Sequence, residues 1–261
     1  MKYIFFLLLF GSVIQANAQC RYKISALEVG ARANNYYESG YSGLSTFQDN
    51  AKEPIQYSGY GYNVSSQGLH QFGSFGIYLH LSRFINDTVF NPNRKLRIGI
   101  SASSAGHGIS GFKDIGNYID TFTKAGFNYY HSYTILSLDI STLRYGKIFW
   151  KRFRPFAGIG ISPGMSLSSK GEFIADTVSH GRFMYNGTSY YYTSSSSAGK
   201  DYAVKPLVFV SAYIPIGLNF RLSKRLDLNL ESRLNLNMYH VKSTTFNTCF
   251  SIMFSAAYKL F

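Results

Sequence analysis

Residues 208–221 (VFVSAYIPIGLNFR) and 226–238 (LDLNLESRLNLNM) alternate between two kinds of side chain with a period of two. In the second stretch every other residue is apolar, except for Ser232, and the residues between are Asp, Asn, Glu or Arg. Alternate side chains of a β-strand point to opposite faces, so each stretch predicts a strand with one apolar and one polar face. Only residues 222–225 separate the two stretches, which predicts an antiparallel hairpin.

The same alternation recurs along the rest of the chain. Six further stretches show it, at residues 27–32, 76–82, 96–103, 136–141, 156–167 and 249–260. Together with the first pair they predict an all-β protein of eight antiparallel strands. The first, third and fifth connections are long (34–68, 107–126 and 169–202), whereas the second, fourth and sixth are short. This alternation of loop lengths is typical of an up-and-down transmembrane β-barrel with its long loops outside the cell.

The composition of the two faces distinguishes a membrane barrel from a soluble one. The apolar face carries hardly any charge over about ten residues, the length of a tilted transmembrane strand. The polar face carries Ser, Asn and small residues such as Gly76, Gly99, Gly158 and Gly160, which suit a narrow interior. A soluble barrel has the opposite polarity, with an apolar inside and a charged outside. We therefore expect the apolar face to meet lipid and the polar face to fill the lumen.

Charged residues on the polar face nearly balance. They are Glu28, Asp139, Asp227 and Glu231 against Arg32, Arg97, Arg221, Arg233 and Lys259. The interior of an eight-stranded barrel is only wide enough for side chains. We expect these charges to pair in a lumen network that plugs the barrel, with His80 as a further member of it and no open aqueous pore.

The N-terminus has the features of a secretory signal peptide. Lys2 is followed by an apolar run at residues 4–10 and by Ala16-Asn17-Ala18, a small-x-small cleavage site. This predicts a signal peptide at 1–18 and a barrel domain at 19–261. A lipoprotein reading of Cys20 is disfavoured because Gln19 and Asn17 do not fit a lipobox.

Composition excludes several other classes of protein. Aromatic residues make up 17% of the 261 residues and charged residues only 15%, which excludes a disordered chain. A mean hydropathy of -0.07 excludes a bundle of transmembrane helices. The formal net charge is +13, and the basic clusters lie at the predicted rims, where they would meet anionic headgroups of outer-membrane phospholipid and lipopolysaccharide. No nucleic acid is needed to explain the charge.

The chain resembles the small bacterial outer-membrane β-barrel proteins of the OmpA-transmembrane and PorT-like type. The resemblance is carried by the signal peptide, by residues 154–160 (RPFAGIG), by the hairpin from 214–218 (IPIGL) to 226–228 (LDL), and by the terminal 258–261 (YKLF). It implies a barrel in the outer membrane of a Gram-negative bacterium, with Phe261 as the signal read by the barrel assembly machinery. Phe261 is out of phase with Leu260 and Tyr258, which leaves the register of the last strand open.

The sequence offers weak candidates for catalysis, metal binding and disulfide formation. Some small barrels modify lipid A and would need a Ser and a His in contact with an acid. His131 and Ser132 are adjacent and must point to opposite faces, so we favour an interface histidine and no enzyme. The six histidines have no metal-ligand spacing, and we expect no metal or cofactor. Cys20 and Cys249 lie about a strand length apart, which predicts two free thiols.

Tyrosines crowd the predicted outer connections. Tyr60 and Tyr62 lie in the first, and Tyr190, Tyr191 and Tyr192 in the third of the long ones. Tyr with Gly and Ser is typical of recognition surfaces, and the alternative is an aromatic girdle at the membrane interface. We expect a non-enzymatic barrel for envelope structure, adhesion or binding of an extracellular glycan or protein. A lipid A-modifying enzyme and a narrow channel or secretion-complex subunit remain as alternatives.

Overall fold

A computed structural model describes residues 22–36, 44–52, 61–86, 89–118, 121–240 and 244–260. The signal peptide, Tyr60 and Phe261, on which predictions were made, lie outside these residues. These residues form nine strands and one short helix. Their bounds are β1 (Tyr22–Tyr36), α2 (Leu44–Asn50), β2 (Asn63–Asn86), β3 (Val89–Tyr118), β4 (Thr121–Tyr145), β5 (Phe153–Tyr185), β6 (Thr188–Ala203), β7 (Val208–Arg221), β8 (Leu226–His240) and β9 (Thr244–Lys259). In this part of the chain no helix is long and apolar enough to cross a membrane.

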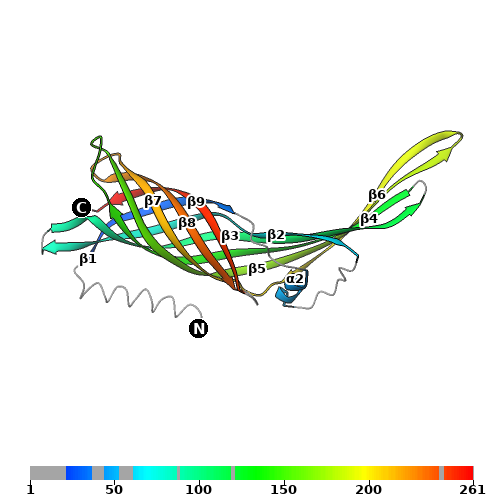
Figure 1. The fold of residues 1–261 in the computed structure, drawn as a ribbon, viewed down its shortest axis with the longest axis horizontal. Helices are drawn as coiled ribbons and strands as arrows, with labels where there is room; N and C mark the ends of the chain where they lie inside the picture. The colour runs from blue at the N-terminus through cyan, green and yellow to red at the C-terminus, as the bar shows by residue number, and fades with distance from the viewer. Residues whose placement is uncertain are drawn as a thin grey trace.

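Eight of the strands close into a ring (Figure 1). Their order is β1-β2-β3-β4-β5-β7-β8-β9, every neighbouring pair is antiparallel, and β9 pairs back onto β1. The β9–β1 ladder runs without a register shift from Lys259 opposite Ala26 to Cys249 opposite Tyr36. Closure removes the open edges that a sheet would otherwise present. The predicted eight-stranded antiparallel barrel is confirmed.

The two faces of the ring have the predicted polarity. On β8, Leu230 and Leu234 point outward and are 45% and 60% exposed, whereas Glu231 and Arg233 point inward and are 0% exposed. The same inversion holds on β9, where Phe254 is exposed and Ser255 is buried. A polar interior and an apolar exterior are stable only where lipid surrounds the ring, so the eight strands form a transmembrane barrel.

Aromatic rings lie across glycines in the lumen. Tyr78 faces Gly99, Tyr213 faces Gly160 and Phe156 faces Gly217, each as direct cross-strand partners. A Cβ at these glycines would overlap the facing ring. The small residues that suggested a narrow lumen therefore make room for large rings from the next strand.

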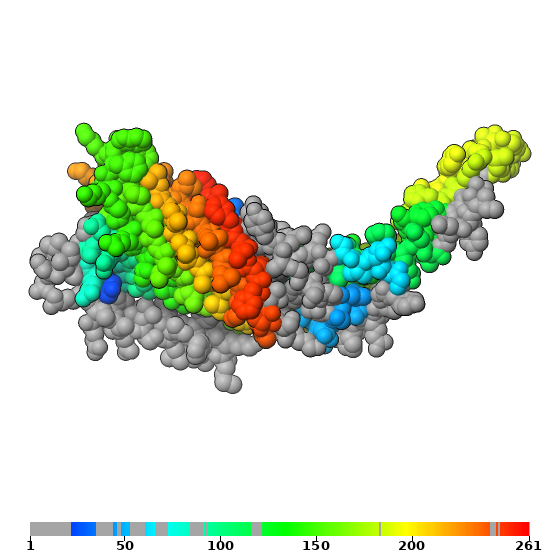
Figure 2. All heavy atoms as spheres, viewed as in Figure 1, coloured from blue at the N-terminus to red at the C-terminus, as the bar shows by residue number. Residues whose placement is uncertain are grey.

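Two of the predicted long loops are instead strands. Residues 107–118 continue β3 and pair with 121–126 and later residues of β4, and most of 169–202 forms the second half of β5 and β6. The prediction missed them because their exposed strands have polar residues on both faces and so lack an amphipathic alternation. In the connection 34–68, the described part holds helix α2 and the start of β2. These extended strands form a narrow projection that leaves one end of the barrel, as Figure 2 shows.

Candidate functional sites: the lumen network, the outer cap and the outer arm

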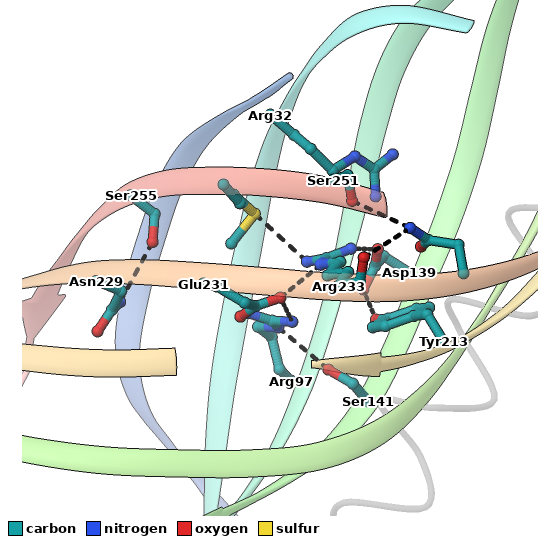
Figure 3. Close-up of polar contacts among 12 residues, drawn as sticks. Arg32, Arg97, Asp139, Ser141, Tyr213, Asn229, Glu231, Arg233, Ser251 and Ser255 are labelled. Carbon is teal, nitrogen blue, oxygen red and sulfur yellow. Dashed lines mark hydrogen bonds and ion pairs between the residues drawn. The ribbon is translucent and has the colours of Figure 1, made fainter. Parts of the chain in front are cut away.

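The centre of the lumen is an ion-pair network around Glu231 (Figure 3). Arg97 of β3 donates two hydrogen bonds to this carboxylate, from Nη1 to Oε2 at 2.7 Å and from Nη2 to Oε1 at 3.0 Å. Arg233 of β8 donates its Nε to the same carboxylate. All three side chains are fully buried. A two-pronged arginine–carboxylate contact fixes orientation as well as charge, so β3 and β8 are tied across the barrel.

The network extends to both sides of this centre. Arg233 Nη1 lies 2.9 Å from Asp139 Oδ2 on β4, and the Tyr213 hydroxyl donates to the other oxygen of Asp139. On the opposite side, Arg97 Nη1 lies 3.8 Å from Glu28 Oε1, and Glu28 also contacts His80 Nε2. The guanidinium groups of Arg97 and Arg233 lie over the rings of Tyr78 and Tyr213 at 5.4 and 4.5 Å. Buried charges that are paired and hydrogen-bonded in this way fill the lumen with fixed groups.

The remaining predicted network residues lie apart from this centre. Arg32 is buried and donates its Nε to Ser74 Oγ at 2.9 Å. Asp227 pairs with Lys259 at 2.6 Å, near the end of the barrel where β8 begins and β9 ends. Arg221 is exposed at that rim, so its assignment to the lumen network was wrong, because β7 ends there and its last side chain reaches solvent. The sequence pattern did not single out Tyr213, which takes part through its position beside Asp139.

A second buried cluster, the outer cap, closes the opposite mouth of the barrel. It consists of Ala51, Ala105, Ile109, Phe127, Tyr129, Tyr133, Ile135, Tyr202, Val204, Leu207, Phe209 and Tyr239. The segment after α2 is pinned to the segment before β7 by Lys52 N donating to Ala203 O at 2.8 Å and Lys205 N to Asn50 O at 2.9 Å. Phe127, Tyr129, Tyr133 and Ile135 alternate along β4, but the sequence does not show that Ala51, Val204 and Leu207 from distant connections pack against them.

Two histidines are buried among the rings of the outer cap. His131 Nε2 lies 2.6 Å from the Tyr202 hydroxyl, and the rings of His107 and His131 meet edge to face at 4.8 Å. His131 lies on the part of β4 that is beyond the last pair of β5 with β7, Met165 with Val208, and burial there lowers the pKa of His131 to about 4. Ser132 points to the opposite face, where it lines an outer hollow with Lys170 and Glu172. The His–Ser pair that the enzyme alternative needs is therefore not formed by these two residues.

The outer arm is the hairpin of residues 170–185 of β5 with β6. β5 leaves β7 after Met165 and pairs with β6 from Lys170 onward. β4 accompanies β5 only as far as Gly181, so the last part of the arm is a two-stranded ribbon. Its tip is Asn186-Gly187, with positive φ at both residues, the turn that suits a two-residue hairpin. Figure 1 shows β6 as the part of the molecule farthest from the barrel.

The predicted recognition tyrosines fall in two different places. Tyr190, Tyr191 and Tyr192 lie on β6 close to the tip and are exposed, Tyr191 by 79%. Tyr62 instead packs edge to face on Phe127 at 5.1 Å, against the outer cap. Its assignment to a recognition surface was wrong because the start of β2 folds onto the cap. The tyrosines on the arm are thus the exposed aromatic group that the prediction anticipated.

The described residues contain one cysteine, which is not in a disulfide. Cys249 is a buried thiol without a disulfide, and Cys20 lies outside the described residues. No group of three or more His, Cys, Asp or Glu side chains is placed to hold a metal ion within the described ranges.

Comparisons with known proteins return bacterial barrels. No protein-family model matches, and no curated protein matches in sequence. Among solved structures, the attachment invasion locus protein Ail of Yersinia pestis, in complex with the heparin analogue sucrose octasulfate, is 13% identical, with 90% of this chain and 97% of that chain covered and a TM-score of 0.32. The outer membrane protease OmpT of Escherichia coli is 9% identical over 92% and 95%, with a TM-score of 0.17. The beta domain of the Bordetella autotransporter BrkA is 8% identical over 91% and 100%, with a TM-score of 0.24.

The architecture itself rests on the strand pairing and the surface of this molecule. A closed antiparallel ring with an apolar exterior and a polar, filled interior is what defines bacterial outer-membrane barrels. On these observations the chain is an outer-membrane β-barrel protein.

Proposed function

We propose that this protein is a non-enzymatic outer-membrane barrel that binds an extracellular glycan or protein through the outer arm. The observation that carries the proposal is the arm itself, a β-ribbon that continues far past the closed ring and exposes Tyr190, Tyr191 and Tyr192 near its tip. Rigid aromatic side chains offer contact area at a low entropic cost, and exposed aromatic groups of this kind are typical of binding surfaces.

The interior supports a binding role over a transport role. The lumen is filled by paired charges at one level and by the outer cap at another. A barrel that is closed at two levels offers no path for a solute, and it holds the outer arm at a fixed place in the membrane. The barrel thus serves as a rigid membrane anchor, and the outer arm binds the ligand.

Orientation is tested by labelling single cysteines on intact cells. Tyr191→Cys at the arm should react with a membrane-impermeant maleimide, whereas Lys224→Cys, in the turn between β7 and β8, should react only after the cells are opened. Both variants also carry Cys20→Ser, because Cys20 is expected to be a free thiol of the mature chain, whereas Cys249 is buried and contributes little background. Labelling of Lys224→Cys and protection of Tyr191→Cys on intact cells would place the arm in the periplasm and refute the proposal.

Binding is tested with a shortened arm. Removing residues 182–185 and 188–191 brings the native Asn186-Gly187 turn directly onto the Gly181–Tyr192 pair and spares every contact of β5 with β4. The purified variant and the wild type, in lipid nanodiscs, are compared on a glycan array, and cells expressing each are compared in adhesion to coated surfaces. A matched control keeps the arm's length and replaces Lys200 and Asp201 with Ser.

The expected result is that the shortened arm loses binding and adhesion at least tenfold while the control keeps them. The shortened protein should still show the folded, heat-modifiable band on gels, because the ring is untouched. Equal binding by the wild type and the shortened variant would contradict the proposal.

A further inference from the structure

Three arginines line one hollow on the outward face of the barrel, at the end where β1 begins and β9 ends. Arg94 of β3 and Arg144 of β4 are direct cross-strand partners. Arg83 of β2 lines the same hollow as Arg94 and Arg144. All three are exposed and alternate with inward-facing neighbours. We name these three residues the arginine row.

Such a row is unfavourable by itself. Like charges directly opposite each other on neighbouring strands destabilise a sheet. In the described residues none of the three makes an ion pair with a carboxylate, and Asp227 at the same end is already paired with Lys259. An anion from outside the chain would remove this repulsion.

The surroundings of the row indicate which anion fits. Arg83, Arg94 and Arg144 line one hollow together with Leu96 and Ile159. The next cross-strand row toward the middle of the barrel is Leu96, Thr142 and Ile159, and the row after it is Ile98, Ile140 and Ile161. A ligand held here therefore meets guanidinium groups at one end and a strip of mostly apolar side chains at the other.

We propose that the arginine row binds the phosphate of an anionic phospholipid in the leaflet at the end where β1 begins and β9 ends, with an acyl chain along the apolar strip. Guanidinium groups match phosphate oxygens with paired N–H donors. The row lies where the apolar band of the barrel ends, which is the depth of lipid headgroups. Free phosphate would satisfy the charges but would leave the apolar strip unused, so the structure favours the lipid.

The test measures lipid binding by the purified barrel in neutral detergent. Dioleoyl-phosphatidylglycerol, dioleoyl-phosphatidylcholine and inorganic phosphate are each titrated, with native mass spectrometry counting bound lipid and the thermal unfolding midpoint reporting stabilisation. The variant is Arg83→Gln, Arg94→Gln and Arg144→Gln together, with Arg94→Gln alone as a milder form. The control removes three cations at the other end, Lys170→Gln, Arg182→Gln and Lys200→Gln.

We expect the wild type and the control to retain phosphatidylglycerol and to unfold at a higher temperature in its presence, because a ligand that binds the folded state stabilises it. The triple variant should bind it at least ~10-fold more weakly, since each cation near an anionic lipid contributes to affinity. Without lipid the triple variant should be as stable as the wild type or more stable, because the repulsion is gone.

Three results would overturn the proposal. Equal retention of phosphatidylglycerol and phosphatidylcholine would remove the requirement for an anion. Unchanged phosphatidylglycerol binding by the folded triple variant, or by Arg94→Gln if the triple variant does not fold, would place the lipid elsewhere. Displacement of the lipid by inorganic phosphate with equal stabilisation would show a site for the free anion.

Discussion

Glu231 is the carboxylate that both central arginines of the lumen contact. Replacing it with Ala would leave the guanidinium groups of Arg97 and Arg233 buried without the carboxylate that both contact. Removing one partner of a buried ion pair typically costs about 3–5 kcal/mol. We therefore expect Glu231→Ala to lower the free energy of unfolding by several kcal/mol, measured by urea unfolding in lipid vesicles. Arg221→Ala at the exposed rim is the control and should change it by less than about 0.5 kcal/mol.

The glycines of the lumen lie where the structure leaves no space for a side chain. A Cβ at Gly217 would lie 2.5 Å from the backbone oxygen of Leu230 and would overlap the Phe156 ring. Gly199 on the outer arm has no atom closer than 3.8 Å to the same position. Gly217→Ala should therefore destabilise the barrel by about 1–3 kcal/mol, and Gly199→Ala should be neutral. A heat-mobility shift on gels measures both, and equal midpoints would contradict the packing described for the lumen.

At the scale of elements, the outer cap joins the α2 segment, β3, β4, β7 and β8, and its stability should depend on pH. Burial holds the pKa of His131 at about 4, below the ordinary 6.5. Above about pH 6.5 the imidazole is neutral whether the cap is closed or open, and the stability is fully present. As pH falls from 6.5 toward 4 the open cap takes up a proton that the closed cap does not, so closure weakens by up to roughly 3 kcal/mol.

Hydrogen exchange of α2 and of residues 204–209 at pH 7.5 and pH 4.5 checks this expectation. Exchange should accelerate at the lower pH in the wild type, and the acceleration should shrink in His131→Gln. His180→Gln on the exposed arm is the control and should behave as the wild type. The His107 ring meets the His131 ring edge to face at 4.8 Å, so His107→Gln serves as a second variant. Identical exchange at both pH values would show that the cap does not sense protonation.

At the scale of the whole molecule, two independent closures fill one barrel. The ion-pair network blocks the lumen near its middle, and the outer cap blocks the outer mouth. Planar-bilayer recordings at neutral pH should show no conductance steps for the wild type. The double variant Arg97→Ala and Arg233→Ala should also stay silent, because the cap remains closed. Regular single-channel steps from the wild type would contradict a plugged lumen.

Much of the fold follows from local pattern in the sequence. The period of two in 226–238 fixes which side chains share a face, because consecutive residues of a strand point to opposite sides whatever surrounds them. The alternation of long and short connections and the few charges on the apolar face then predict a membrane barrel. The same pattern placed Glu28, Arg97, Asp139, Glu231 and Arg233 inside, where the structure has them.

What only the tertiary structure decided are the contacts between segments far apart in the chain. Which arginine meets which carboxylate depends on the register and tilt of eight strands, and no local pattern contains that information. The arm was not predicted because β6 is mostly polar and is held by ladder hydrogen bonds to β5. The cap was not predicted because its apolar residues come from segments far apart in the chain. Arg221 and Tyr62 show the same limit, because a side chain's surroundings are set by where its strand ends within the closed ring.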